Sequence, residues 1–282
     1  MSSIVPEYPD GLTLPLLTEI ISGISFPVGE EAFDIPSFFT SFKALEKIKY
    51  VPSVQPLSAT EDIDTLCSKY GGQRPYISVQ HPYPYCDEMP RIFFFQLCVN
   101  DIPEDIRPSS LAANSIIQLF KCGLDDGFCT AYDDKAGTTD PGYLCRIVHP
   151  LLETASSEYP EEVEDAYPCK KVTEFIPHLA FPGYDEFCEH FPDKSFEMEW
   201  IFAFLEQLDE KFDFLVDGIG GYANWIQNVD FAPCDVCHSD SILVYQIDYQ
   251  GPLGYEFGDG GNCQILVCPE HGECVKMVWA CG

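Results

Sequence analysis

The chain has 282 residues, 46% of them hydrophobic, and its formal net charge at pH 7 is −31. This hydrophobic content can bury a real core, so the chain is not a disordered acidic tail, and its length fits one large domain or two of ordinary size. The charge repels phosphate backbones and anionic membrane surfaces, which argues against direct binding of nucleic acid or membranes. It serves either solubility or the attraction of a basic protein partner.

The start of the chain and the cysteines indicate the compartment. The first ten residues lack the basic region and apolar stretch of a secretory signal, and no later apolar run approaches the length of about 18 residues that a membrane helix needs. We therefore expect a cytoplasmic protein. A reducing compartment would keep the 14 cysteines as thiols, which favours metal binding or simple burial over disulfide bonds.

The first expected element is a helix over residues 36–48. Phe38, Phe42 and Leu45 recur at helical spacing, and Pro36 fits a first turn. The stripe predicts a face that packs on a core; a groove for a partner is the other interpretation.

A strand pattern follows, and it occurs twice in the same order of features. The first copy consists of Gly71-Gly72, the apolar run 92–97 with Gln96, residues 116–122 and Cys129. The second copy consists of Gly220-Gly221, the run 242–247 with Gln246, residues 264–268 and Cys274. The runs are short and rich in β-branched and aromatic residues, which is typical of strands buried on both faces. The Gly-Gly pairs favour tight turns over phosphate binding, because no strand-glycine-helix fingerprint follows them.

Two segments separate the copies. Residues 153–168 are dense in acids, serine and proline and show no apolar period, which indicates a linker or a long surface loop. In residues 197–212, Trp200, Phe204, Leu208 and Phe212 are spaced four apart, which predicts a second helix facing the core.

These elements predict an α+β, β-rich fold of two tandem related β units, an internal duplication with a few flanking helices. Residues 1–150 would form the first repeat with an N-terminal helical extension, 151–168 an acidic linker or loop, and 169–282 the second repeat. The buried amides of Gln96 and Gln246 must be hydrogen-bonded, and we expect them to cross-link the repeats.

The second repeat carries a metal-binding pattern. Cys234 and Cys237 precede one strand, and Cys268 and His271 follow the next, so two knuckles at adjacent strand ends would form a tetrahedral Cys3His site for one structural zinc ion. Pro269 would fix one turn of the second knuckle and Gly272 would relieve another. Cys274 is the alternative fourth ligand, and a redox-active Cys-x-x-Cys pair is disfavoured because a strand follows it. His238 is expected to be exposed.

The first repeat has only a partial counterpart of this site. Cys86, Cys122 and Cys129 occupy comparable positions, and Cys67, Cys98 or His81 would have to complete a second metal site. Buried free thiols are the alternative. The remaining cysteines, which lack metal-binding spacing, are expected to fill apolar space: Cys145, Cys169, Cys188, Cys263 and Cys281.

With these residues in place, the chain resembles the YwqG-like family over residues 70–282. The first-half matches are Phe95-Gln96, Asp101-Ile-Pro103, Ile117-Gln-Leu-Phe-Lys-Cys122 and Arg146-Ile-Val148. The second-half matches are Phe181-Pro-Gly-Tyr184, Ile219-Gly-Gly-Tyr-Ala-Asn-Trp-Ile-Gln227, Tyr245-Gln-Ile-Asp248, Phe257-Gly-Asp-Gly-Gly261 and Cys268-Pro-Glu-His271. The layout is also similar to the programmed-cell-death-protein-two-like family, whose association with escorting a ribosomal protein implies a binding role.

Two classes of function remain. No serine, cysteine or histidine motif indicates a nucleophile with an oriented base, which favours a non-enzymatic binding module: an acidic chaperone, adaptor or toxin inhibitor for a basic protein. The alternative is an enzyme or small-ligand-binding protein that uses the Gly258–Gly261 loop with Asp248 and Asp259, although Asp259 in such a sequence also suits a simple turn.

Overall fold

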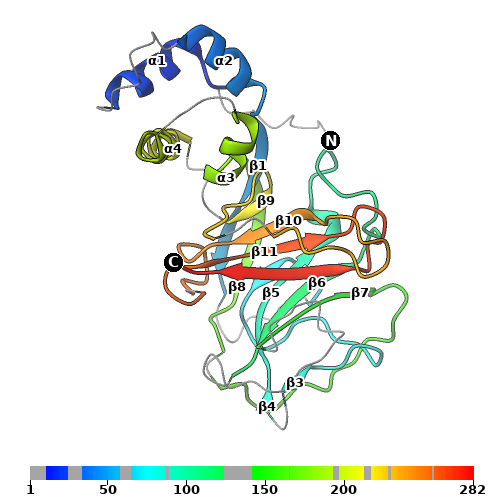
Figure 1. Cartoon of the computed structure of the whole chain (residues 1–282). Coiled ribbons are helices and arrows are strands. Elements are labelled where there is room, and N and C mark those ends of the chain that lie inside the picture. The colour runs from blue at the N-terminus through cyan, green and yellow to red at the C-terminus, as the bar shows by residue number, and fades with distance from the viewer. Residues whose placement is uncertain are drawn as a thin grey trace, which may run out of the picture.

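The structure is a computed structural model that describes residues 11–24, 34–57, 65–86, 89–123, 142–164, 166–192, 197–212, 217–227, 230–255 and 257–282. One antiparallel ten-stranded sheet forms its centre, with the strand order β12-β11-β10-β9-β1-β8-β2-β5-β6-β7 (Figure 1). The sheet curls until its end strands approach each other, and the rings of Tyr143 in β7 and Trp279 in β12 have centroids 6.2 Å apart. The predicted β-rich class is confirmed as a nearly closed sheet accompanied by four described helices.

The strands of this sheet have the following bounds: β1 (Lys47–Pro56), β2 (Lys69–Tyr70), β5 (Ile92–Cys98), β6 (Ile116–Lys121), β7 (Tyr143–Val148), β8 (Lys170–Ala180), β9 (Gly218–Gly220), β10 (Ile242–Ile247), β11 (Asn262–Val267) and β12 (Val275–Ala280). Two short strands, β3 (Tyr85–Cys86) and β4 (Met89–Pro90), form a separate pair, and the 3-10 helix η1 spans Val99–Asp101.

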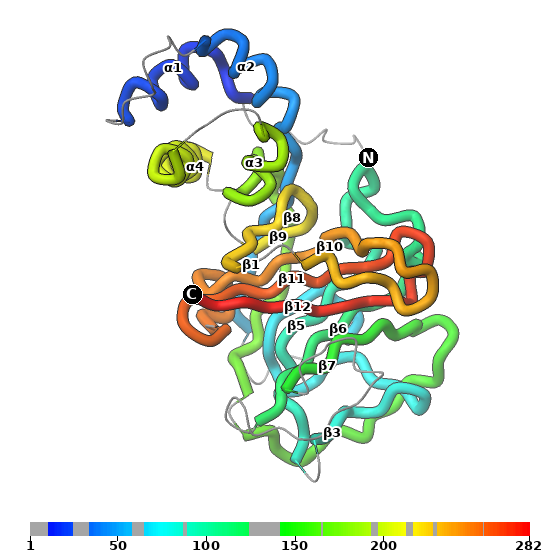
Figure 2. The backbone as a smooth tube through the Cα atoms, viewed as in Figure 1, coloured from blue at the N-terminus to red at the C-terminus, as the bar shows by residue number. Residues whose placement is uncertain are grey.

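Strands of the two halves are exchanged at the centre of the sheet. β1 comes from the N-terminal half but lies between β8 and β9, and β8 lies between β1 and β2. On each side of this central pair the remaining strands follow outward in chain order. They are β9, β10, β11 and β12 on one side and β2, β5, β6 and β7 on the other. The two halves therefore share one sheet. Figure 2 shows how closely the two sets of strands run against each other.

Several details recur at corresponding places on the two sides. Gln96 pairs with Gln118 across β5 and β6, Gln246 pairs with Gln264 across β10 and β11, and each pair of strands has a register irregularity two or three residues before its glutamine. These correspondences concern strand order and register, and descent from a duplication stays a prediction.

The predicted role of the glutamines as a link between repeats is wrong. Gln96 Oε1 accepts a hydrogen bond from the Tyr76 N–H (3.1 Å), and Gln246 Oε1 accepts one from the Asn224 N–H (2.7 Å). Each amide thus ties its strand to the segment after the Gly-Gly pair of its own half. The reason is geometric: a strand side chain reaches its neighbours on the same face before it can reach the other half.

Both Gly-Gly pairs form tight turns, as predicted. Gly71, Gly72, Gly220 and Gly221 have φ between 58° and 84°, a region that side chains rarely allow. A Cβ on Gly71 would also lie 2.6 Å from the Pro168 carbonyl oxygen. The turns therefore require glycine for conformation and for close approach.

The helices gather on one side of the sheet, at the top of Figure 1. They are α1 (Leu14–Gly23), α2 (Ile35–Lys43), α3 (Tyr184–His190) and α4 (Met198–Phe212). Phe38, Phe42 and Phe204 are completely buried in an aromatic core between them, with the Phe42 and Phe204 ring centroids 5.2 Å apart. The predicted core-facing stripes of both helices are confirmed. None of the helices that the structure describes combines the length and apolar character required to cross a membrane.

The predicted helix over residues 36–48 ends earlier than expected. α2 stops at Lys43, and β1 begins at Lys47 and pairs with β8 along ten positions. Leu45 continues the helical spacing, but it does so from a turn, where it still packs against the helical core. Pairing with distant β8 therefore prevails over local helical spacing.

The acidic segment between the halves lies against the first half. Ala155 forms a β-bridge with Ser78, Tyr159 Oη donates to the Pro75 carbonyl (2.9 Å), and Val163 is buried beside Phe93 and Phe120.

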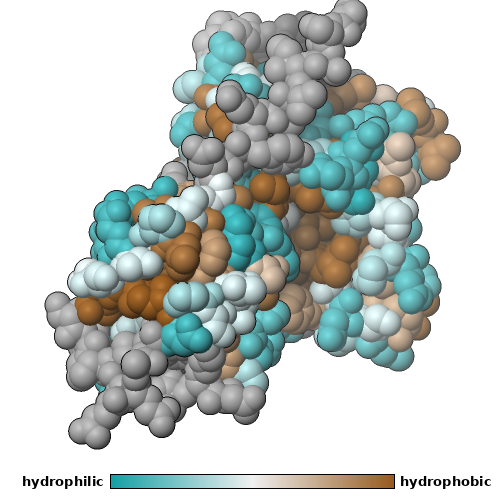
Figure 3. Space-filling model, turned by 90° about the horizontal axis from the view of Figure 1, so that it is seen from above, coloured by the Kyte–Doolittle hydropathy of each residue, from teal (hydrophilic) through white to brown (hydrophobic). Residues whose placement is uncertain are grey.

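Figure 3, which views the molecule from the side of the helices, shows hydrophobic and hydrophilic patches alternating on the described surface.

Polar side chains from both sides meet inside the curled sheet. Tyr70 of β2 donates to the Asp217 carboxylate (2.9 Å) and is hydrogen-bonded to Tyr245 of β10. The Asp248 N–H donates to the second Asp217 oxygen, and Lys49 of β1 is completely buried nearby. Burial raises the pKa of Asp217 to about 7, even though the bonds from Asp248 and Tyr70 and the charge of Lys49 act to lower it.

We predict that Asp217 makes stability depend on pH. Its folded pKa of about 7 exceeds the ordinary 3.8, so the unfolded chain loses this proton first, and the free energy of unfolding falls as pH rises from about 4 to about 7. The slope is at most about 1.4 kcal/mol per pH unit. Asp217→Asn removes this contribution, so its stability relative to wild type should increase from pH 5 to pH 7 in urea unfolding. The exposed control Asp259→Asn should not show the change, and parallel curves for wild type and Asp217→Asn would contradict the prediction.

Candidate metal centre

The four predicted ligands lie at one end of the sheet. Cys234 and Cys237 belong to the turn before β10, and Cys268 and His271 to the turn after β11. β10 and β11 are antiparallel neighbours, with Ile242 opposite Val267, so the chain before one strand emerges beside the chain after the other. Their ligand atoms all lie within 4.8 Å of one another. The structure thus brings the predicted residues together.

The distances among these atoms suit a small tetrahedral ion. Cys237 Sγ and Cys268 Sγ are 3.5 Å apart, and His271 Nδ1 lies 3.6 Å from Cys268 Sγ and 3.7 Å from Cys234 Sγ. With metal–sulfur and metal–nitrogen bonds of about 2.3 and 2.0 Å, tetrahedral geometry requires separations of about 3.8 Å between sulfurs and about 3.6 Å between sulfur and nitrogen. The group can therefore hold a metal ion.

Backbone N–H groups point at the sulfurs. Cys268 Sγ accepts from the N–H groups of Glu270 (3.4 Å) and His271 (3.3 Å), and Cys234 Sγ accepts from that of Val236 (3.4 Å). Burial raises the pKa of the Cys234 thiol, but the backbone N–H bonds, together with the hydrogen bonds from the Cys268 and Cys274 thiols, outweigh burial and lower the pKa to about 7. Such bonds stabilise thiolates and orient them toward a metal.

The knuckle is braced against the first half of the chain. Ser110 Oγ donates to the Cys268 carbonyl (2.8 Å), and His149 Nε2 lies 2.9 Å from a carboxylate oxygen of Glu273. Gly272 does not have a positive φ, so the predicted relief of a turn is wrong. Glycine is required because a Cβ there would lie 2.0 Å from the Ser110 carbonyl oxygen. This bracing had no signal in the sequence, because it depends on the approach of two distant loops.

The other histidine and cysteine candidates take different positions. His238 is exposed, as predicted, with φ at 59°. Cys274 lies outside the four-atom group but near enough to Cys234 for their thiols to affect each other's pKa. It stays the alternative fourth ligand.

The first-half candidates are not assembled into a comparable group among the described residues. Cys86 and Cys122 are buried, Cys129 lies outside the described residues, and Cys98 Sγ donates to the Leu66 carbonyl (2.7 Å). His81 is 3.1 Å from the Glu153 carboxylate. Cys145, Cys169 and Cys263 are buried, as predicted, whereas Cys188 and Cys281 are partly buried.

The two carboxylates of the alternative site lie in different surroundings. Asp248 is buried, accepts from the Gln250 N–H (3.0 Å) and lies within the charged group around Asp217. Asp259 is exposed in a turn between Phe257 and Gly261, where its carbonyl accepts from the Gly282 N–H (3.2 Å). Here Asp259 has the geometry of a turn residue.

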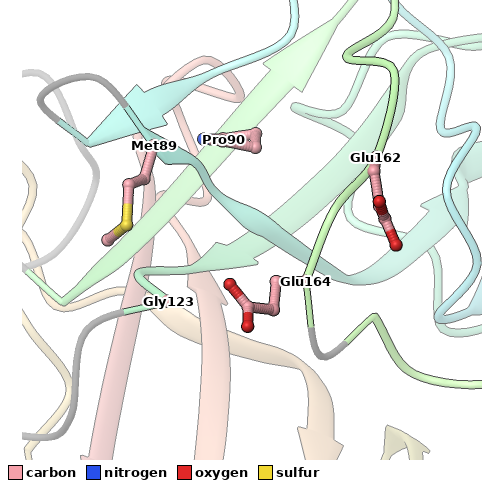
Figure 4. A pocket seen from close by; sticks show the side chains of 5 residues that line it. All are labelled: Met89, Pro90, Gly123, Glu162 and Glu164. Carbon is pink, nitrogen blue, oxygen red and sulfur yellow. The ribbon is translucent and has the colours of Figure 1, made fainter.

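Two cavities lie elsewhere on the described surface. One of about 440 Å³ is lined by Met89, Pro90, Gly123, Glu162 and Glu164, and Figure 4 shows both glutamates coming from the acidic segment. The other, of about 500 Å³, runs along β8 from Lys171 to Phe175 and faces Leu66 and Asp101. Neither lining includes a residue of the four-ligand group.

Comparison with known proteins identifies one family. Residues 68–271 match the model of a family described as a domain of unknown function (DUF1963). The match includes both Gly-Gly turns and all four candidate ligands. No curated protein matches the chain.

We predict that metal binding depends on the four grouped residues. Cys234→Ser, Cys268→Ser and His271→Ala should each lose the ion, because each removes one of the four bonds that hold it. Cys188→Ser, which changes a partly buried thiol outside the group, should retain it. Elemental analysis after exposure to a chelator measures the metal per chain. Loss of metal from Cys274→Ser but not from His271→Ala would show that Cys274 is the fourth ligand.

Proposed function

Because the chain belongs to the DUF1963 family, whose description names no activity, we propose a function from its own residues: a non-enzymatic binding protein for a basic protein partner, stabilised by one structural zinc ion. Chaperone, adaptor and inhibitor are the roles that such binding would serve. The observation that carries the structural ion is the four-residue ligand set of the candidate metal centre, and the net charge of −31 carries the basic partner.

A set of three thiolates and one imidazole favours zinc. Soft sulfur ligands disfavour magnesium and calcium, which prefer oxygen, and the tetrahedral spacing is typical of zinc. Four protein ligands also occupy all positions of a tetrahedral ion, whereas a catalytic zinc keeps one position for water or substrate. The proposed ion is therefore structural.

The distribution of charge supports binding over catalysis. The chain has a net charge of −31. Among its acidic groups with strongly raised pKa values, Asp217, Tyr70 and Tyr245 are buried in the centre of the sheet, and Glu186 of α3, whose pKa burial raises to about 7, is partly buried. A catalytic acid has to meet its substrate, whereas a charged surface acts at a distance on any oppositely charged partner. The likeness to the programmed-cell-death-protein-two-like family supports a binding role, and the cysteine content supports a reducing compartment such as the cytoplasm.

We also propose that the two sides of the sheet derive from an internal duplication. Support comes from the repeated Gly-Gly turns, the two glutamine pairs and the mirrored strand order. In this interpretation each copy gave its first strand to the sheet of the other.

We predict that protein purified without added metal contains one zinc per chain. Because a structural ion is bound by the folded state, its removal should lower the free energy of unfolding by several kcal/mol. Urea unfolding before and after chelation measures the effect, and chelation should not change the stability of Cys268→Ser. A wild-type protein that folds fully without metal contradicts this prediction.

The basic-partner proposal predicts a salt-dependent association rate. Electrostatic steering acts over the Debye length, which shortens from about 30 Å at 0.01 M to about 8 Å at 0.15 M ionic strength. The association rate of the partner isolated from the native host should therefore fall over this range in stopped-flow measurements. A neutral or acidic partner, or a flat rate, would leave the charge as a solubility device.

A further inference from the structure

The most exposed apolar side chains of the described residues lie on loops at the end of the sheet that carries the metal centre. Among the exposed large hydrophobic residues, the four with the greatest exposed fractions are Leu152 (82%), Leu151 (76%), Val79 (68%) and Val236 (65%). We call these four residues the apolar face. A single exposed aliphatic residue needs no explanation. Several of the most exposed apolar residues at one end of a protein, in contrast, indicate an interaction site.

The loops that present Val79, Leu151 and Leu152 are bonded to each other. The Val79 N–H donates to the Thr154 carbonyl (2.8 Å), and Ser78 forms a β-bridge with Ala155. The Glu153 carboxylate is held by Ser78 Oγ and the His149 N–H (2.6 Å) and lies 3.1 Å from His81 Nδ1. The two leucines therefore lie on a turn that is already held in place by hydrogen bonds. Binding of a partner would not have to order this turn, which reduces the entropic cost of binding.

The metal knuckle joins these loops. His149, at the base of the leucine turn, contacts Glu273 between His271 and Cys274. Val236 lies between the ligands Cys234 and Cys237, with its N–H donating to the Cys234 sulfur. In Figure 2 the loop after β7 and the turns around β11 and β12 extend at the same end of the molecule.

The exposed charges of the knuckle turns, which form the rim of the apolar face beside Val236, are mainly acidic. Asp235, Asp240, Glu270 and Glu273 are exposed on the knuckle turns. Lys276, a lysine beside them, forms an ion pair with Asp235. This rim disfavours nucleic acid and anionic lipid and complements lysine or arginine.

We propose that the apolar face binds a segment of a partner protein that carries aliphatic side chains among lysines or arginines, with the aliphatic groups on the leucine turn and the cations on the acidic rim. This inference rests on the proposed function and assigns its site and the kind of segment recognised. Buried aliphatic contacts would provide most of the affinity, and the rim would provide orientation and selectivity.

Two synthetic peptides test the proposal on the full, zinc-loaded chain. Both have the same leucine positions in an amphipathic pattern, and their charged positions are all lysine in one and all glutamate in the other. In fluorescence anisotropy titrations the lysine peptide should bind wild type, and the glutamate peptide should bind at least tenfold more weakly. Leu151→Ser/Leu152→Ser should weaken lysine-peptide binding at least tenfold. The matched control Ile176→Ser, which changes an apolar residue 43% exposed on β8, should leave it unchanged.

The outcomes separate the two levels of the proposal. If the lysine peptide binds the leucine variant as tightly as wild type, the apolar face is wrong and binding of basic partners still stands. If the lysine peptide does not bind wild type even at 0.01 M salt, both are contradicted. Circular dichroism and zinc content of the leucine variant check its fold. A photo-crosslinking lysine peptide should attach within residues 149–154 or 234–238, and attachment elsewhere overturns the assignment.

Discussion

The pairing of β1 with β8 is the interaction on which the rest of the structure depends. Ten positions are joined, from Lys47 opposite Ala180 to Pro56 opposite Lys170. On its outer edges the pair continues into β9 and β2. Without it the sheet would separate into two smaller sheets, one with β1 and the other with β8 as an unpaired edge strand. The curled interior and the meeting of Tyr70 with Tyr245 both follow from this continuity.

The continuous sheet also determines where charged residues are buried. A lysine and an aspartate lie inside the curled sheet, whereas other acidic residues lie on its exposed turns. Lys49 lies on β1, and Asp217 immediately precedes β9, so the pairing of β1 with β9 brings a buried cation close to a buried acid. A buried acid without partners would be far more costly than one held by Tyr70 and the Asp248 N–H. The acidic residues of the knuckle turns, in contrast, remain in water, where they can act on other molecules.

Local patterns in the sequence predicted the parts of this protein whose signal is local. The strand runs 92–97 and 242–247, the stripe of α4 and the four grouped ligands were all visible from residue type and spacing. β1 and β8 were missed because prolines and lysines interrupt their apolar pattern, and their stability comes from pairing with each other. The bracing by Ser110 and the burial of Asp217 could not be found either, since both depend on segments distant in the chain.

The central strand pair also has a consequence in time. Every partner of β1 in the sheet lies more than a hundred residues further along the chain. During synthesis β1 therefore leaves the ribosome long before β8 or β9 has been made. Phe38 and Phe42 of α2 likewise leave it before α4, against which they pack, has been made. Contacts of such high sequence separation slow folding and lengthen the exposure of apolar surface. The nascent N-terminal half of this protein therefore keeps this apolar surface without its final partners until most of the chain has been made.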